Sequence, residues 1–230
     1  MDKLSNAFSL LAFADEDGPM VSSSSSSSSF TAIQEERVNG SVEIGDYKQP
    51  LVWIDLEMTG LNVEVDRILE IACIITDGNL TKSVEGPDIV IHQTKDCMDK
   101  MNEWCQTHHG ASGLTKKVLL STISERQAEQ EVIEFVTKHV GSEKSLLAGN
   151  SIYVDFIFLK KYMPDLAALF PHTLVDVSSV KALCFRWFPK EKRRAPAKEN
   201  KHRALDDIRE SVKELKYYKE TIFKSNKARR

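Results

Sequence analysis

The sequence has few cysteines, and none of them are closely paired. Its four are Cys73, Cys97, Cys105 and Cys184; none forms a C-x-x-C pair, and two lie in apolar stretches typical of a core. This pattern excludes a structural zinc site of the usual spacing and is typical of a reducing compartment. Apolar runs are also short, since none approaches the roughly 20 residues needed to cross a bilayer. The sequence therefore predicts no membrane span and no membrane partner.

A strong charge of either sign is also missing. The 230 residues carry a net charge of −3. Residues 1–46 hold two basic and eight acidic side chains (2 − 8 = −6), so the other 184 residues sum to +3. Domains that bind long duplexes through phosphate contacts are usually strongly basic. A short or single-stranded substrate fits this balance better.

The first 46 residues lack the apolar content of a folded segment. They contain eight consecutive serines, Ser22–Ser29, with acidic residues on both sides. Such a composition cannot bury enough apolar area to offset the entropy of ordering. Transit peptides are usually rich in arginine and poor in acids, whereas this segment has one arginine, Arg37, and eight acids. We therefore expect a disordered tail and a cytoplasmic protein, with mitochondrial or other organellar import as the alternative.

From Tyr47 onward the pattern is that of one domain, which we expect to span residues 47–223, followed by a basic tail, residues 224–230. Strand-like runs at 51–54, 68–76 and 83–92 come first, and Asp77-Gly78 indicates a hairpin between the second and third. Helical patterns follow at about 96–106 and 124–140, then a short apolar run at 146–148 and a helix through Tyr162. A strand at 174–177, a helix to Trp187, a charged loop at 188–201 and a helix at about 203–219 complete the chain. Hairpin strands followed by alternating helices and strands predict an α/β domain with a mixed central sheet.

Two carboxylates stand at the end of the first predicted strand. Asp55 and Glu57 are two residues apart, so their side chains point to the same face of the strand. They would repel each other unless a cation lay between them, and a hard divalent ion such as Mg²⁺ or Mn²⁺ is the natural occupant. An isolated D-x-E pair is more often merely solvated.

Further acids lie at two helix starts. Asp155 is the single acid in an otherwise mostly apolar helical segment, and the pair Asp206-Asp207 opens the last helix. Taken alone, each is explained by the preference of acids for the first turn of a helix. Periodicity does not decide between Asp206 and Asp207 as a functional residue.

Together these segments resemble the His-containing branch of the DEDD exonuclease superfamily, and specifically the oligoribonucleases, in a eukaryotic, plant-like member. The family pattern has a D-x-E on the first strand, then N-S-x-x-x-D, then a closing H-x-x-x-x-D. The resemblance runs from about Leu51 to Phe223 and includes these segments: Trp53–Leu61, Ala111–Leu114, Lys161–Pro164 and Leu205–Ser211. It implies a ribonuclease H-like fold, and it assigns the four metal-binding carboxylates to Asp55, Glu57, Asp155 and Asp207.

The resemblance also implies a mechanism. Four carboxylates and two divalent cations, Mg²⁺ or Mn²⁺, balance in charge and activate water for attack on the last phosphodiester bond. His202 corresponds to the general base, a role suited to a group that titrates near neutrality. His202 and Asp207 would lie about 140° apart on one continuous helix. We therefore expect His202 on the loop before the helix and Asp207 in its first turns.

Substrate contacts follow from the same resemblance. Gly60 lets the chain leave the strand sharply, Leu61 matches a hydrophobic wedge, and Trp104 and His109 match side chains that stack on bases. Core packing is the alternative for Leu61 and Trp104. Ser151 and Ser178 occupy positions suited to phosphate or 3′-end contacts.

The chain also departs from its bacterial relatives, which carry a Tyr-Arg pair where it has His172-Thr173, so the resemblance does not say how the 5′ end of the substrate is capped. Residues 190–203, with seven basic and two acidic side chains (7 − 2 = +5), could attract a phosphate there. A solvated flexible loop is the alternative.

The predicted function is thus a 3′→5′ exoribonuclease, a homodimer, that degrades short single-stranded RNA of about two to five nucleotides. Two other functions stay open from the sequence: a DNA-directed exonuclease of the same superfamily, and a catalytically silent nucleic-acid-binding scaffold. Comparing the turnover of short RNA and DNA distinguishes the exoribonuclease from a DNA-directed exonuclease. A measurement of Mn²⁺ binding distinguishes it from the silent scaffold.

Overall fold

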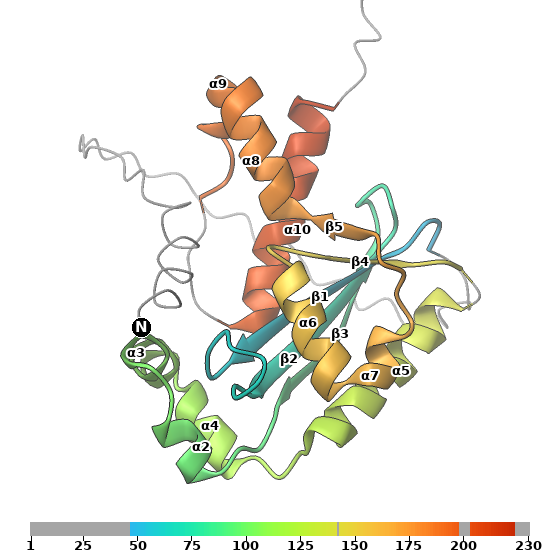
Figure 1. Cartoon of the computed structure of the whole chain (residues 1–230). Helices are drawn as coiled ribbons and strands as arrows, with labels where there is room; N and C mark the ends of the chain where they lie inside the picture. The colour runs from blue at the N-terminus through green and yellow to red at the C-terminus, as the bar shows by residue number, and fades with distance from the viewer. Residues whose placement is uncertain (1–46, 142, 198–202, 224–230) are drawn as a thin grey trace, which may run out of the picture. The chain divides into compact units, whose positions relative to one another are not determined.

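A mixed five-stranded sheet forms the centre of the described part of the chain, which in this computed structural model comprises residues 47–141, 143–197 and 203–223 (Figure 1). Its strands, in the spatial order β3-β2-β1-β4-β5, are β1 (Leu51–Met58), β2 (Ile68–Thr76), β3 (Ser83–Val90), β4 (Leu146–Gly149) and β5 (Leu174–Asp176). β2 pairs antiparallel with β1 and β3, whereas β4 pairs parallel with β1 and β5. The predicted α/β class with a mixed sheet is confirmed.

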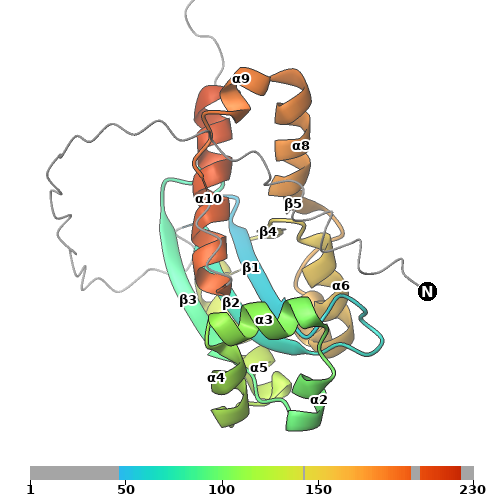
Figure 2. The same ribbon diagram turned by 90° about the vertical axis from the view of Figure 1, so that its left-hand side faces the viewer.

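The sheet separates two apolar cores because side chains alternate along each strand. On β1, Val52, Ile54 and Leu56 belong to the core formed with α5 (Glu125–Val140) and α6 (Tyr153–Tyr162). Trp53 belongs to the other core, under α10 (Ala204–Thr221). Figure 2 shows α10 and α6 on either side of β1. Asp55 and Glu57 have the parity of Trp53, so their side chains face the α10 side.

The remaining helices are α2 (Lys95–Asp99), α3 (Glu103–Ala111), α4 (Leu114–Leu120), α7 (Pro164–Ala167), α8 (Val177–Trp187) and α9 (Pro189–Lys192). The single helix expected at about 96–106 is wrong. It divides because Asn102 begins a new helix, its side chain accepting a hydrogen bond from the Cys105 amide at 2.8 Å. The loop expected at 188–201 contains the short helix α9, opened by Pro189 at its first position.

The strand ends bring the functional candidates to one edge of the sheet. β1, β4 and β5 are parallel, so their carboxyl ends lie at the same edge, where ligands bind in open α/β sheets. All four cysteines are free thiols. Among the described helices, none is both long enough and apolar enough to span a membrane. The expected tails, residues 1–46 and 224–230, lie outside the described residues.

Candidate active site

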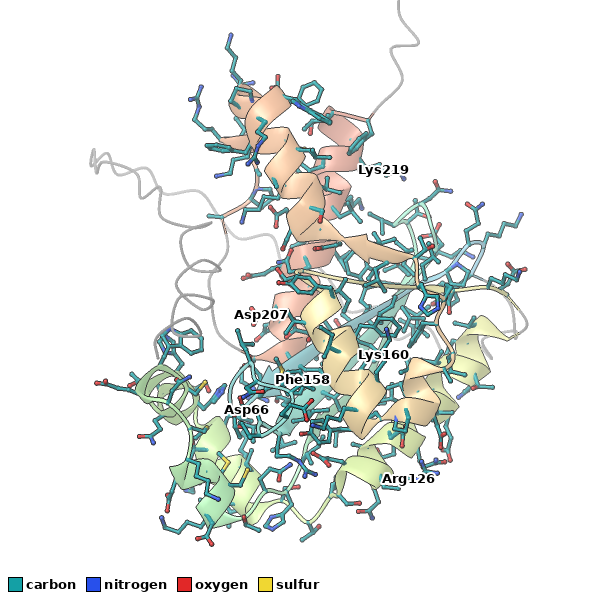
Figure 3. The ribbon with its side chains drawn as sticks, in the orientation of Figure 1. Asp66, Arg126, Phe158, Lys160, Asp207 and Lys219 are labelled. Atoms are coloured by element: carbon teal, nitrogen blue, oxygen red, sulfur yellow. The ribbon has the colours of Figure 1, made fainter. Side chains whose placement is uncertain are left out.

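Three carboxylates from two distant parts of the chain converge on the α10 face of β1. Asp55 and Glu57 come from β1 and Asp207 from the first turn of α10, and one oxygen of each lies within 4.8 Å of the others. Figure 3 shows Asp207 on α10, beside the carboxyl-terminal half of β1. The neighbouring Asp206 is instead paired with Arg209, at 2.9 Å between Oδ1 and Nη1. The structure thus distinguishes the two acids that periodicity left open.

Asp155 reaches the same strand from the opposite layer. Strand pairing of β1 with β4 ends at Trp53 and Ala148, which leaves the following backbone of β1 without a strand neighbour on that side. Asp155, in the first turn of α6, takes this place and accepts a hydrogen bond from the Leu56 amide at 3.0 Å. Its carboxylate is therefore held between the positions of Asp55 and Glu57, although it is not part of the three-acid group.

Burial and mutual repulsion disfavour full ionisation of this group. The pKa of Glu57 is raised to about 8, first by burial and then by the charges of Asp207, Glu70 and Asp155. Burial also raises the pKa of Asp155, against the lowering effect of the Leu56 amide. Clustered carboxylate oxygens that resist ionisation together suit a hard divalent cation, which removes the repulsion. The donor set therefore fits the expected metal.

A β-bulge shapes the strand beside these acids. The register of β1 against β2 shifts between Glu57 and Met58, and a bulge of this kind re-aims neighbouring side chains. His109 of α3 fills the space there. Its ring is buried, with Nε2 2.9 Å from the Met58 carbonyl oxygen and Nδ1 3.9 Å from Glu57 Oε2.

Trp104, the other predicted stacking residue, is only half-buried. Its ring stacks on His108 with 3.9 Å between centroids, and His108 Nδ1 lies 2.7 Å from the Trp104 carbonyl oxygen. This contact fixes one face of the indole ring.

The connection from β1 to β2 holds Leu61 in an ordered loop. Asp66 accepts hydrogen bonds from the Thr59 hydroxyl at 2.9 Å and from the Asn62 amide at 2.8 Å. A Cβ at Gly60 would lie 2.5 Å from the Asp66 carboxylate. The glycine therefore leaves room for the Asp66 carboxylate, and its φ is not positive. Leu61 follows it and is half-buried.

Ser151 and Ser178 lie together, with 3.1 Å between their Oγ atoms. Asp176, at the end of β5, accepts hydrogen bonds from both of their amides at 2.9 Å. These bonds hold Ser151 at a φ of 49°, which is uncommon for a residue with a side chain. Asp176 was missed from the sequence, where its signal is an acid at a strand end that caps the next helix.

The expected general base, His202, lies outside the described residues. The first residue of α10, Ala204, comes two positions later in the sequence. His172 and Thr173 are exposed just before β5.

Comparison with known proteins decides the family. The exonuclease family model, RNase T, matches residues 52–215. An Arabidopsis thaliana oligoribonuclease is 79% identical over 227 residues, covering 99% of this chain and 100% of that protein. The human mitochondrial oligoribonuclease is 51% identical over 176 residues, covering 76% of this chain and 74% of that protein.

The chain belongs to the oligoribonuclease family. Membership makes it a hydrolytic 3′→5′ exoribonuclease, and it confirms the resemblance and the enzyme class inferred from the sequence.

Solved structures of more distant proteins agree on the fold of this oligoribonuclease. An exonuclease I structure superposes with a TM-score of 0.59 at 16% identity, covering 75% of this chain and 41% of that chain. An Escherichia coli exonuclease I complex with single-stranded DNA, in a zinc-bound form, gives 0.60 at 16% identity, covering 77% and 42%. The chain thus spans about two fifths of these proteins, and the likeness confirms the ribonuclease H-like fold.

Proposed function

We propose that this oligoribonuclease degrades RNA of about two to five nucleotides to nucleoside 5′-monophosphates by two-metal-ion hydrolysis. The observation that supports it is the convergence of Asp55, Glu57 and Asp207 within 4.8 Å, with Asp155 fixed to the strand between the first two. Four carboxylates in this arrangement match the charge of two divalent cations.

Asp55, Glu57, Asp155 and Asp207 would hold two ions, either Mg²⁺ or Mn²⁺. When bound, such ions lower the pKa of an attacking water and stabilise the oxygen that leaves. Asp155 contributes orientation as well as charge, because the Leu56 amide fixes its Oδ1. His202 would accept the proton of the attacking water.

Substrate binding would use side chains around the same strand end. Leu61 is proposed to contact the terminal base from a loop that Asp66 holds in place. Trp104 is proposed to stack on a base, next to the His108 ring that it already contacts. His109 stays a proposed substrate residue, and its contact with the Met58 carbonyl also allows it to support the strand. Ser151 and Ser178 would bind phosphate or the 3′ end through their paired hydroxyl groups.

Product analysis on end-labelled oligonucleotides tests this proposal. RNA of two, five and twenty nucleotides and the matching DNA are each incubated with Mg²⁺, with Mn²⁺ and with EDTA. We expect nucleoside 5′-monophosphates from the short RNA, slower turnover of the longer RNA, and none with EDTA. Faster turnover of DNA would show a DNA-directed exonuclease, and absence of turnover with intact metal binding would contradict the proposed reaction.

We further propose that the enzyme is a homodimer. Around the carboxyl end of α8, large apolar side chains are exposed to solvent, including Phe185 at 55% and Trp187 at 66%, with Leu183 and Phe188 beside them. Exposed apolar patches of this kind mark interaction sites. The family resemblance implies a dimer, and we propose that a second copy of the chain covers this face.

The proposed compartment is the cytoplasm. Mitochondrial import is the alternative, and it is supported by the human, bovine and mouse relatives, which are named mitochondrial oligoribonucleases. Imaging a fluorescent fusion of the full chain, and of the chain without residues 1–46, decides between them.

A further inference from the structure

A buried glutamate lies directly opposite the proposed metal ligands. Glu70 of β2 is fully buried and is the register partner of Glu57 across the β1–β2 pair. Paired residues of neighbouring strands project on the same face. Glu70 therefore faces α10 alongside Glu57, and the two like charges repel, which contributes to the raised pKa of Glu57.

Arg203 compensates this buried charge with a two-pronged contact. Its Nε lies 3.1 Å from each carboxylate oxygen of Glu70, and its Nη2 makes a shorter contact with Oε1. A planar guanidinium fork holds a carboxylate in a fixed geometry that a lysine cannot reproduce. A second carboxylate, that of Asp88 of β3, lies 4.0 Å from Arg203 Nη2.

The same glutamate caps the helix that carries Asp207. The first residue of α10, Ala204, donates its amide to Glu70 Oε2 at 3.4 Å, and Arg203 itself, at the N-cap position, makes no side-chain capping bond. The orphan amides of a helix start need an acceptor, and here strand β2 supplies one. The start of α10 is thereby tied to the strand next to β1.

We propose that Glu70 and Arg203 are positioning residues for the catalytic centre, an inference that rests on the proposed function. The pair fixes the start of α10, so that Asp207, one turn later, meets Asp55 and Glu57. In addition, Arg203 neutralises Glu70, which leaves the charge of the four proposed ligands to the two cations.

A merely stabilising ion pair makes a different prediction. Replacing a buried ion pair by apolar side chains is often neutral for stability. If the pair only stabilised the fold, turnover would be kept, whereas turnover falls if the pair positions the start of α10. Arg209 provides a matched control on the same helix, because it bonds Glu85 and Asp206, and its partner Glu85 is 48% exposed whereas Glu70 is buried. Breaking that pair leaves the start of α10 attached to β2.

The experiment compares Arg203→Met, Arg203→Lys, Glu70→Gln and the control Arg209→Met with the unaltered enzyme. Steady-state turnover of an RNA dinucleotide in Mg²⁺ gives kcat and KM, and hydrogen exchange of the amides of residues 204–208 reports the helix start. For Arg203→Met we expect kcat to fall about a hundredfold with KM within about threefold, since misplaced groups lose orientation and not binding. Amides 204–208 should exchange faster, and Arg203→Lys should restore only part of kcat.

The outcomes distinguish failure of the proposed positioning role from failure of the proposed function. A folded Arg203→Met enzyme with unchanged kcat, or an equal loss in Arg209→Met, would overturn the positioning role. If Arg203→Met does not fold, the double variant Glu70→Met/Arg203→Met removes the unpaired buried charge and is measured in its place. Failure of the unaltered enzyme to cleave RNA would instead reject the proposed function.

Discussion

At the scale of single residues, two adjacent aspartates have separate surroundings. Asp207 lies with Asp55 and Glu57, whereas Asp206 is paired with Arg209. We expect Asp207→Asn to lower kcat on the order of a thousandfold, because a lost ligand weakens metal stabilisation of charge in the reaction. Turnover of an RNA dinucleotide in Mg²⁺ measures it.

Asp206→Asn is the matched control and should keep near-normal turnover. The metal-free Asp207→Asn protein should be at least as stable as the unaltered one, because the Asp207 charge raises the pKa of Glu57. Normal turnover in Asp207→Asn, or its loss in Asp206→Asn, would mean that the wrong aspartate has been assigned.

The raised pKa of Glu57 predicts how stability depends on pH. Folding raises this pKa from 4.5 to about 8, so between these values the folded protein binds more protons than the unfolded chain. The free energy of unfolding of the metal-free protein should therefore fall as pH rises through this window, by at most a few kcal/mol.

Thermal melts in EDTA from pH 5 to pH 8 measure this fall. It should be smaller in Glu57→Gln, and saturating Mg²⁺ should suppress it because the cation stabilises the ionised carboxylates. A pH dependence identical in the unaltered protein and in Glu57→Gln would show that Glu57 titrates normally.

At the scale of elements, β4 packs closely against β1 just before the first of the acids, Asp55. A Cβ at Gly149 would lie 3.0 Å from the Ile54 carbonyl oxygen, next to Asp55, and 3.0 Å from Ile152 Cδ1. We expect Gly149→Ala to lower the free energy of unfolding by about 1–3 kcal/mol through overpacking. It should also reduce turnover.

Gly110→Ala in α3 is the control, since a Cβ there meets no atom within 4 Å. Alanine is the better helix former, so this variant should be neutral or slightly more stable. Denaturant unfolding of both variants makes the comparison. Equal stabilities would show that β4 can move away from β1 without cost.

The strands followed from the sequence because their signal is local. The position predicted for β2 is confirmed, whereas β1 begins at the predicted residue and continues beyond the apolar run to Met58. The helices around 95–120 were harder to predict from the sequence. The helical pattern there is continuous, but one capping side chain, Asn102, begins a new helix within it. Short helices such as α7 and α9 have too few residues for any periodicity to appear.

At the scale of the whole molecule, the site assembles side chains from three layers. The meeting of Asp55, Glu57 and Asp207 depends on α10 packing beside β1, and no local pattern encodes that contact. The resemblance supplied these residues in advance. It did not supply Asp176, Glu70 or Arg203, whose roles depend on hydrogen bonds between elements far apart in the chain. Such partners become visible only in the folded structure.

The proposed homodimer is also tested at this scale. Trp187→Asp places a charge on the exposed apolar face of α8, and we expect it to yield monomers, because burying an unpaired charge in an interface is costly. Light scattering after size-exclusion chromatography measures the mass. Leu120→Asp is the control, because the Leu120 side chain of α4 is about as exposed as that of Trp187. This variant should stay dimeric. A monomeric unaltered protein, or a dimeric Trp187→Asp, would contradict the proposed interface.

The central claim is that four scattered carboxylates surround a pair of divalent cations. The most direct measurement is a crystal structure in Mn²⁺ with anomalous diffraction. The account predicts two anomalous peaks roughly 3.5–4 Å apart, bound by Asp55, Glu57, Asp155 and Asp207. Absence of any peak among these carboxylates at saturating Mn²⁺, or peaks bound by other residues, would contradict it.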